Sequence, residues 1–160
     1  MSVESVRRLF EEENLSDAIL YSEVISDTVE HAAELIGCKP KEIAKTMSFL
    51  IDEDPIVIVT AGDAKIDNAK YKSRFGVKAK MIHYEDVERY TGHIPGGVSP
   101  FALKENVKVY LDVSLKRFEI VYAGAGDEHH TVKVTLEQLE RLSMSCGWVD
   151  VCKDWMTESN

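Results

Sequence analysis

The clearest alternation of hydrophobic and polar positions lies in the segment KTMSFLI (45–51). There Met47, Phe49 and Ile51 fall on one side of an extended backbone, and the residues between them fall on the other. After the turn residues DEDP comes IVIVT (56–60), a β-branched run suited to a buried partner strand. The two segments therefore predict a β-hairpin.

Shorter patterns predict the remaining elements. Helices are expected after Ser2 and at 27–36, 67–74, 84–91 and 136–142, and further strands at 18–22, 107–112, 117–123, 131–135 and 148–152. Asp27 and Glu30 resemble a capping box for the second helix, which Gly37 is expected to end. Thr135 is expected to cap the last helix. Because the strands cluster antiparallel with helices interspersed, the pattern favours the α+β class.

The composition is that of a globular protein. The chain has 160 residues, of which 44% are hydrophobic and 29% charged, and it shows no internal repeat or flexible linker. We therefore expect a single domain over residues 1–160. No stretch approaches the roughly 20 apolar residues of a membrane helix, and the charged N-terminus does not resemble a signal peptide. A cytoplasmic protein with no membrane partner is the expectation.

Several common kinds of site find no support in the sequence. The three cysteines, Cys38, Cys146 and Cys152, have no CxxC spacing and are expected to be reduced packing residues. The five histidines match no standard set of metal ligands, so His129 and His130 are interpreted as surface residues and neither a metal nor another cofactor is expected. The signatures of P-loop NTPases, α/β-hydrolases and zinc deaminases are absent.

Charge is distributed unevenly along the chain. The net charge of −9 argues against a general affinity for nucleic acid, and no DNA partner is expected. Residues 65–80 nevertheless hold six basic residues and one aspartate, a local charge of +5. This segment is either a solvated helix face or a patch that binds a polyanion. If the patch binds tRNA, Lys70, Lys72 and Arg74 are the candidate contacts.

Two further features are candidates for chemistry. Lys45 stands in IAKTMSF between a helical turn and a strand, where it either holds a substrate oxygen or extends its ammonium group to water. The segment GHIPGGVSPF (92–101) has three glycines, two prolines and no charge, which makes it unusually bare. Further along, Gly124 and Gly126 follow a predicted strand directly and permit close approach of another segment or a ligand.

Taken in order, several segments resemble the YbaK/ProX family of aminoacyl-tRNA deacylases, which is related to the editing domain of bacterial prolyl-tRNA synthetase. The segments are HAAELIG (31–37), KEIAKTMSF (41–49), VTAGDAKIDNAKY (59–71), TGHIPGGVSPF (91–101), DVSL (112–115) and VYAGAG (121–126). Each is a weak signal alone, but together they cover about residues 15–152 in a consistent order. The family's GxxxP signature falls on Gly96 to Pro100.

This resemblance implies a mixed, mostly antiparallel β-sheet or barrel surrounded by helices. It implies catalytic roles for Lys45, Gly96 and Pro100, in which the lysine positions the substrate and backbone amides of the loop hold the ester carbonyl and the terminal adenosine. It also implies that the substrate is bound by Tyr21, Thr28, Gly97, Ser99 and Gly124.

Three functions stay open. The favoured one is a freestanding, trans-editing deacylase that hydrolyses the ester of a mischarged tRNA of the Cys-tRNA(Pro) or Ala-tRNA(Pro) class. The alternative is a non-catalytic protein of the same fold that binds an amino acid or an aminoacyl-tRNA and regulates another protein. The third is a binding module unrelated to tRNA. The basic segment supports the first two, with aminoacyl-tRNA as the expected partner, and the acidic remainder of the chain suggests help from a synthetase or another partner.

Overall fold

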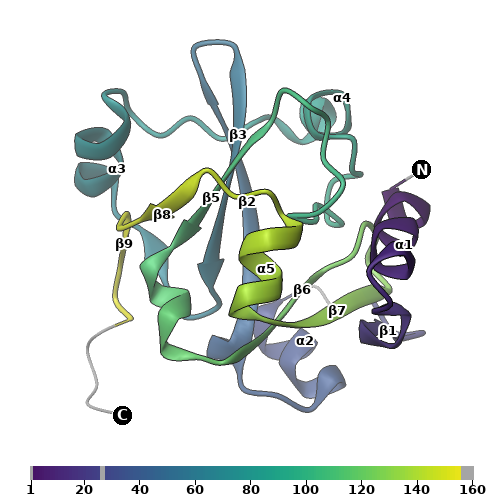
Figure 1. Ribbon diagram of the computed structural model, residues 1–160. Helices are drawn as coiled ribbons and strands as arrows, with labels where there is room; N and C mark the ends of the chain where they lie inside the picture. Colours follow the sequence, from purple (N-terminus) through teal and green to yellow (C-terminus); the bar gives the residue numbers. More distant parts are fainter. Residues whose placement is uncertain (1, 26–27, 156–160) are drawn as a thin grey trace.

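The computed structural model describes residues 2–25 and 28–155 (Figure 1). Its helices are α1 (Ser2–Glu12), α2 (Val29–Ile36), α3 (Asn68–Phe75), α4 (Val87–Thr91) and α5 (Leu136–Leu142), with shorter 3-10 turns η1 (Ser16–Ala18), η2 (Pro40–Glu42), η3 (Tyr84–Asp86) and η4 (Val113–Arg117). Its strands are β1 (Ile19–Tyr21), β2 (Ile43–Ile51), β3 (Asp54–Ala61), β4 (Lys65–Ile66), β5 (Lys108–Asp112), β6 (Ile120–Gly124), β7 (His130–Thr135), β8 (Gly147–Val149) and β9 (Cys152–Lys153). The α+β class predicted from the sequence is confirmed.

Seven strands form one mixed sheet in the order β1-β7-β6-β2-β3-β5-β8. The longest ladder is the antiparallel hairpin of β2 and β3, which pairs Ala44 with Ala61 at one end and Ile51 with Asp54 at the other. β6 and β7 are also antiparallel, whereas β2 runs parallel to β6 and β3 runs parallel to β5. The predicted hairpin is therefore the centre of the sheet, and it aligns the start of β2 with the end of β6.

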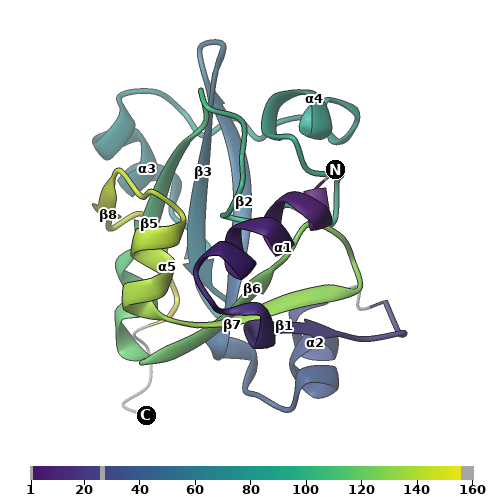
Figure 2. The same ribbon diagram turned by 45° about the vertical axis from the view of Figure 1, so that its right-hand side comes forward.

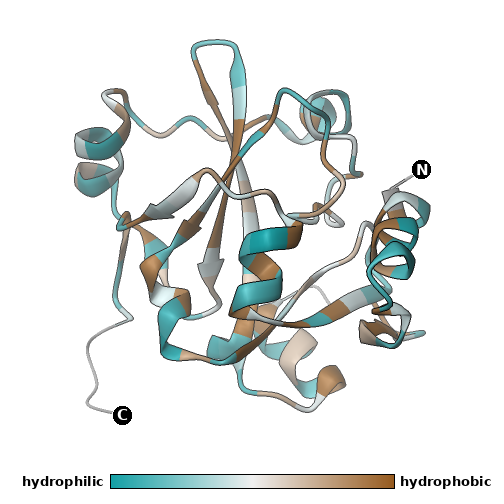
Figure 3. Cartoon of the chain, viewed as in Figure 1, coloured by the Kyte–Doolittle hydropathy of each residue, from teal (hydrophilic) through white to brown (hydrophobic). Residues whose placement is uncertain are grey.

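The core is built around β3. Its residues from Pro55 to Ala61 are all buried, as expected of a central strand covered on both faces. Figure 3 shows this strand in hydrophobic colours, while α3 and the outer side of α5 are hydrophilic. In Figures 1 and 2, α5 lies in front of the sheet and α2 lies below it, beside β6 and β7. On the side of α1, Phe10 packs edge-on against Phe101, with ring centroids 5.1 Å apart.

Local capping signals account for several boundaries. Thr135 and Gln138 form a capping box at the start of α5, and Gly37 ends α2 in the left-handed conformation, as predicted. The predicted start of α2 needs a correction. Its N-cap is Thr28, whose hydroxyl accepts the N–H of His31, whereas Asp27 lies outside the described residues.

The predicted strand at 148–152 is in fact two strands in different sheets. β8 pairs with β5, whereas β9 pairs with β4. The break occurs where the buried carboxylate of Asp112 accepts the N–H of Val151, which turns the chain out of the main sheet. A second difference is that the strand predicted from residue 117 begins only at Ile120, because 113–117 form η4. Among the described residues, no helix is long and apolar enough to cross a membrane.

Candidate functional site

A cavity of about 140 Å³ lies where α2, the start of β2, the end of β6 and the start of β7 meet. It is lined by Ala32 and Ile36 of α2, by Ile43 of β2, by Tyr122, Ala123 and Gly124 of β6, by Asp127, Glu128, His130 and Thr131, and by Gly96 of the proline- and glycine-rich loop. Two of the glycines singled out in the sequence, Gly96 and Gly124, are therefore brought together. They are 28 positions apart in the chain.

The loop wall of this cavity is made of backbone against backbone. A side chain at Gly97 has no room, because its Cβ would lie 2.6 Å from the Cα of Asp127. At Gly124 a Cβ would lie 3.1 Å from the carbonyl oxygen of Val98. Gly96 has a φ of +85°, a left-handed conformation that favours glycine, and it is exposed at the cavity. Close packing against 124–127 thus explains why the loop is bare.

The other loop residues with predicted roles are turned away from the cavity. Ser99 is fully buried, and its hydroxyl accepts the N–H of Phe101. Pro100 is buried and lines a separate groove between α1 and α5. The buried ring of His93 ties the two ends of the loop together, because its Nε2 lies 2.7 Å from the carbonyl oxygen of Phe101. In this conformation Ser99 and Pro100 act on the cavity only through the shape of the loop.

Lys45 lies on the same side of β2 as Ile43, since side chains alternate along a strand. Its ammonium group does not line the cavity but donates a hydrogen bond of 2.7 Å to the carbonyl oxygen of Ala64. Burial lowers the pKa of Lys45 below its ordinary value, although the nearby carboxylates of Asp63 and Glu30 favour the charged form. Lys45 is therefore half-buried, two residues along β2 from Ile43, which lines the cavity.

An ion pair braces the turn that holds Lys45. Arg117 contacts both carboxylate oxygens of Asp63, at 2.6 and 3.0 Å, and donates from Nε to the carbonyl oxygen of Ser114. Its guanidinium group also lies over the rings of Phe118 and Trp155, at 4.8 and 4.9 Å from their centroids. Asp63 directly precedes the residue that accepts from Lys45, so this brace fixes the position of the accepting carbonyl.

The cavity also contains a histidine–aspartate pair that the sequence analysis missed. Nδ1 of His130 lies 2.9 Å from Oδ1 of Asp127, which also accepts the backbone N–H groups of His129 and His130. Burial by itself raises the pKa of Asp127, but these hydrogen bonds outweigh it and hold that pKa below its ordinary value. An ionised Asp127 accepts from Nδ1–H of His130, and in the tautomer that makes this bond Nε2 is the nitrogen with a free lone pair. The signal available in the sequence was the pair of adjacent histidines, His129 and His130, with the acidic residue Asp127 three positions before His130.

Tyr21 and Thr28 lie on neighbouring elements. Tyr21 is opposite His130 in the ladder of β1 and β7, and its ring contacts the rings of His129 and His130. Thr28 is committed to capping α2 through the N–H of His31. Tyr21 is therefore beside the cavity, whereas Thr28 affects it by fixing the start of the helix that covers it.

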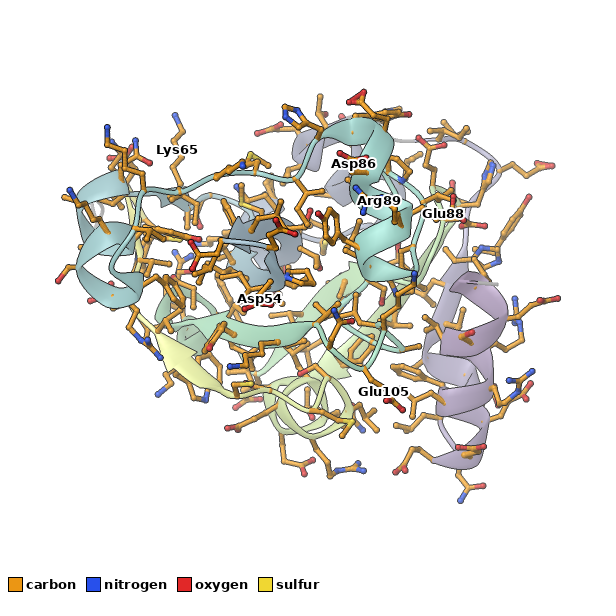
Figure 4. All side chains as sticks on the ribbon, turned by 90° about the horizontal axis from the view of Figure 1, so that it is seen from above. Asp54, Lys65, Asp86, Glu88, Arg89 and Glu105 are labelled. Carbon is orange, nitrogen blue, oxygen red and sulfur yellow. The ribbon has the colours of Figure 1, made fainter. Side chains whose placement is uncertain are left out.

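The predicted tRNA-binding residues all lie on α3, but two of them already have partners. Lys70 contacts the carboxylate of Asp150 and the carbonyl oxygen of Cys152, and Arg74 stacks over the ring of Tyr110. Lys72 faces a hollow that it shares with Lys78. In Figure 4, Lys65 lies toward α3, whereas Asp86 of η3 lies at the opposite side together with Glu88 and Arg89 of α4.

No group of three or more histidine, cysteine, aspartate or glutamate side chains within residues 2–25 and 28–155 is arranged to hold a metal ion. Cys38, Cys146 and Cys152 are free thiols in the same part of the chain. Burial raises the pKa of Cys152, and the neighbouring Asp112 adds to the effect, so this thiol is a packing residue rather than a nucleophile.

Residues 25–142 match the sequence profile of the aminoacyl-tRNA editing domain family. The chain belongs to this family. Its resemblance to YbaK-like proteins, read from ordered motifs, is thereby confirmed. The match includes β2 with Lys45, the loop with Gly96, and the pair formed by Asp127 and His130.

Individual relatives agree with this assignment. The chain is 46% identical to the uncharacterized protein YwhH of Bacillus subtilis over 97% of its own length and 99% of that protein. It is 29% identical to EbsC of Enterococcus faecalis, provisionally named a Cys-tRNA(Pro)/Cys-tRNA(Cys) deacylase, over 75% of this chain and 73% of EbsC. The match to two proline–tRNA ligases spans only about a fifth of their length. Among solved structures, a provisionally assigned trans-editing enzyme for prolyl tRNA synthetase has the same fold, with a TM-score of 0.85 at 21% identity over 96% of this chain and 98% of the other.

Proposed function

We propose that this protein is a trans-editing aminoacyl-tRNA deacylase that hydrolyses the ester of a mischarged tRNA. The observation that carries the proposal is the cavity, in which an exposed glycine backbone faces a hydrogen-bonded histidine–aspartate pair. Family membership supplies the substrate class. The same proposal includes three further points. The protein acts as a single domain, it needs no cofactor, and it meets its aminoacyl-tRNA substrate in the cytoplasm.

In the proposed reaction, water attacks the ester carbonyl and His130 takes up the proton at Nε2, while Asp127 holds the ring and stabilises its charged form. Negative charge then develops on the carbonyl oxygen. Gly96 lines the cavity and its amide donates to no other described residue, so this amide is available to that oxygen. The proton finally passes to the ribose oxygen that leaves, which gives a free amino acid and a tRNA with its terminal hydroxyl restored.

We assign Lys45 to positioning the substrate rather than to attack. Its ammonium group already donates to a carbonyl oxygen, and it holds a positive charge beside the cavity. A cation there suits a phosphate or carbonyl oxygen of the terminal nucleotide. Gly97 and Gly124, with Ser99 and Pro100 behind them, supply the rigid wall against which the ester lies.

The size of the cavity supports a small amino acid. Its volume of about 140 Å³ is below the roughly 300–1,000 Å³ of pockets that hold drug-sized ligands. Ala32 and Ile36 of α2 give it an apolar side, which suits an alanyl or cysteinyl group better than a large or charged side chain. Substrates of the Ala-tRNA(Pro) and Cys-tRNA(Pro) class are the corresponding candidates.

Release of amino acid from a panel of mischarged tRNAs tests the proposal. The purified protein is expected to accelerate hydrolysis above the spontaneous rate for at least one small amino acid. The replacement His130→Asn is expected to lower that rate by about 100-fold or more, within the range of general acid–base catalysis, whereas the exposed control His83→Asn leaves it unchanged. Tight binding of aminoacyl-tRNA without hydrolysis would favour a non-catalytic regulator instead. Neither binding nor hydrolysis would reject both functions.

A further inference from the structure

Glu128 is the second carboxylate of the cavity, after Asp127. Its side chain is exposed and lies along Gly96, because Oε2 is 3.1 Å and the carboxylate carbon 3.5 Å from the position that a Cβ of Gly96 would occupy. Asp127 is engaged by the N–H groups of His129 and His130. The carboxylate of Glu128, in contrast, forms no hydrogen bond or ion pair with any other described residue. Glu128 is therefore an uncommitted acceptor beside the glycine-rich loop.

The surroundings of this carboxylate favour a cation. Among the described residues, those that line the cavity include two acidic side chains and no lysine or arginine. Lys45, two residues along β2 from the lining residue Ile43, donates to the carbonyl oxygen of Ala64 and not to a carboxylate. An unpaired carboxylate at the edge of the cavity stabilises a positive charge placed there.

We propose that Glu128 binds the α-ammonium group of the aminoacyl ester and thereby selects substrates whose amino group is free. The inference rests on the proposed function and adds a specificity contact to it. In such an ester the nitrogen is two bonds, of roughly 1.5 Å each, from the carbonyl carbon. A carbonyl oxygen held by the amide of Gly96 therefore brings the nitrogen close to the side chain that lies along Gly96. With an ordinary pKa of about 7.7–8.0, an α-amino group is mostly a cation at neutral pH.

The turn that carries Glu128 is held in place before any ligand binds. Oδ1 of Asp127 accepts the N–H groups of His129 and His130, which closes the turn after Glu128. On the other side, Gly97 packs directly against the backbone of Asp127. Since the backbone is fixed on both sides of Glu128, only the end of this side chain has to be ordered when it binds a cation.

This contact distinguishes two classes of ester on tRNA. A single amino acid presents a cation to Glu128, whereas the N-acylated amino acid of a growing peptide presents a neutral amide. A neutral group leaves the charge of the carboxylate unpaired, and the acyl chain needs space beyond a cavity of about 140 Å³. The proposed deacylase therefore releases single amino acids and leaves peptidyl esters intact.

Two esters that differ only at the α-position test the contact. One RNA hairpin carries the amino acid that the panel of mischarged tRNAs shows to be released fastest, and the other carries the corresponding α-hydroxy acid, which lacks the cation. Glu128→Gln is expected to lower kcat/KM for the aminoacyl ester by about 10-fold, at the low end for hydrogen bonds to charged groups because Glu128 is exposed. For the hydroxyacyl ester the expected change is less than about twofold.

Two further variants sharpen the test. Glu128→Lys is expected to lower kcat/KM for the aminoacyl ester more than Glu128→Gln does, because like charges repel. Glu53→Gln is the matched control, since Glu53 is an exposed carboxylate in the turn between β2 and β3 and does not line the cavity. It is expected to change neither ester. Each variant is compared with the wild type on the same ester, so the difference in reactivity between the esters cancels.

Equal losses on both esters would overturn the proposal, because Glu128 would then act through the shape of the loop at Gly96 rather than on the amino group. Unchanged kinetics of Glu128→Gln on the aminoacyl ester would overturn it as well. If the wild type hydrolyses no ester in the panel, the proposed function fails and the contact is decided by binding. Non-hydrolysable 3′-alanylamido-adenosine and its lactyl counterpart are then titrated against the wild type and Glu128→Gln. A preference for the alanyl compound that Glu128→Gln loses supports the contact, whereas equal affinities, or no binding of either compound, would reject it.

Discussion

The loop wall of the cavity is built from backbone packed on backbone, whereas Lys45 is held by a chain of side-chain contacts. At the wall, Gly97 touches the backbone at Asp127, and no side chain intervenes. At the lysine, the ammonium group depends on the carbonyl of Ala64, which is braced by the ion pair of Asp63 and Arg117. The two constructions fail in different ways. Adding atoms disrupts the wall, while removing atoms disrupts the lysine and its brace.

The largest expected effect is on activity, at the lysine. Lys45→Ala is expected to lower deacylation by 100-fold or more, about 2.7 kcal/mol of transition-state stabilisation. The fold should persist, because the side chain is half-buried and donates to a backbone carbonyl oxygen rather than to another side chain. Single-turnover hydrolysis with a thermal melt measures both quantities. The control is Lys65→Ala, an exposed lysine two residues after Asp63, and an equal loss in the control would reject a specific role.

The second effect is on stability, at the wall. Gly97→Ala places a Cβ against the backbone of Gly126 and Asp127 at less than 3.0 Å, so the two loops have to separate. We expect a loss of about 2–3 kcal/mol in the free energy of unfolding, in the upper range for overpacking. Gly96→Ala meets only the flexible end of Glu128, and its strain comes from a φ of +85°, at about 1–2 kcal/mol.

Urea unfolding of the two glycine variants gives the comparison directly. If Gly96→Ala loses more stability than Gly97→Ala, the left-handed backbone at Gly96 constrains the loop more strongly than the contact of Gly97 with 126–127 does. Equal stability of both variants and the wild type would show that the loop moves freely from its neighbour. In either case the explanation of the bare sequence by close packing would be wrong.

A smaller effect is expected at the brace. Asp63→Asn weakens the ion pair with Arg117. Because the side chains of both residues are partly exposed to solvent, screening limits the loss in the free energy of unfolding to about 1 kcal/mol. Activity should fall by about 10-fold, because the Ala64 carbonyl is less well held against Lys45. In the Lys45→Ala background the same replacement should have almost no effect on activity, since its target is gone. Additive losses in this double-mutant cycle would show that Asp63 acts independently of Lys45.

The contrast between wall and brace also explains what could be predicted from the sequence. The β2–β3 hairpin, the cap of α5 and the end of α2 depend on neighbouring residues, so local patterns revealed them. The loop at 92–101 was recognisable from its composition, because it is rich in glycine and proline and has no charged residue. The ion pair of Asp63 with Arg117 joins residues 54 positions apart, and no local pattern contains it. The pair of β4 and β9 was missed for the same reason.

The smallest expected effect is a pH dependence within the loop. His93 is fully buried, its Nε2 lies 2.7 Å from the carbonyl oxygen of Phe101, and its Nδ1 has no hydrogen-bond partner among the described residues. Burial lowers the pKa of His93, although the bond to Phe101 opposes this. Below about pH 6.5 the unfolded chain therefore binds a proton that the folded chain resists, and stability falls as the pH falls. His93→Gln keeps a donor for Phe101 but does not titrate. Urea unfolding between pH 8 and 5 should show the wild type losing more stability than the variant, and parallel curves would mean that His93 is protonated as easily in the fold as outside it.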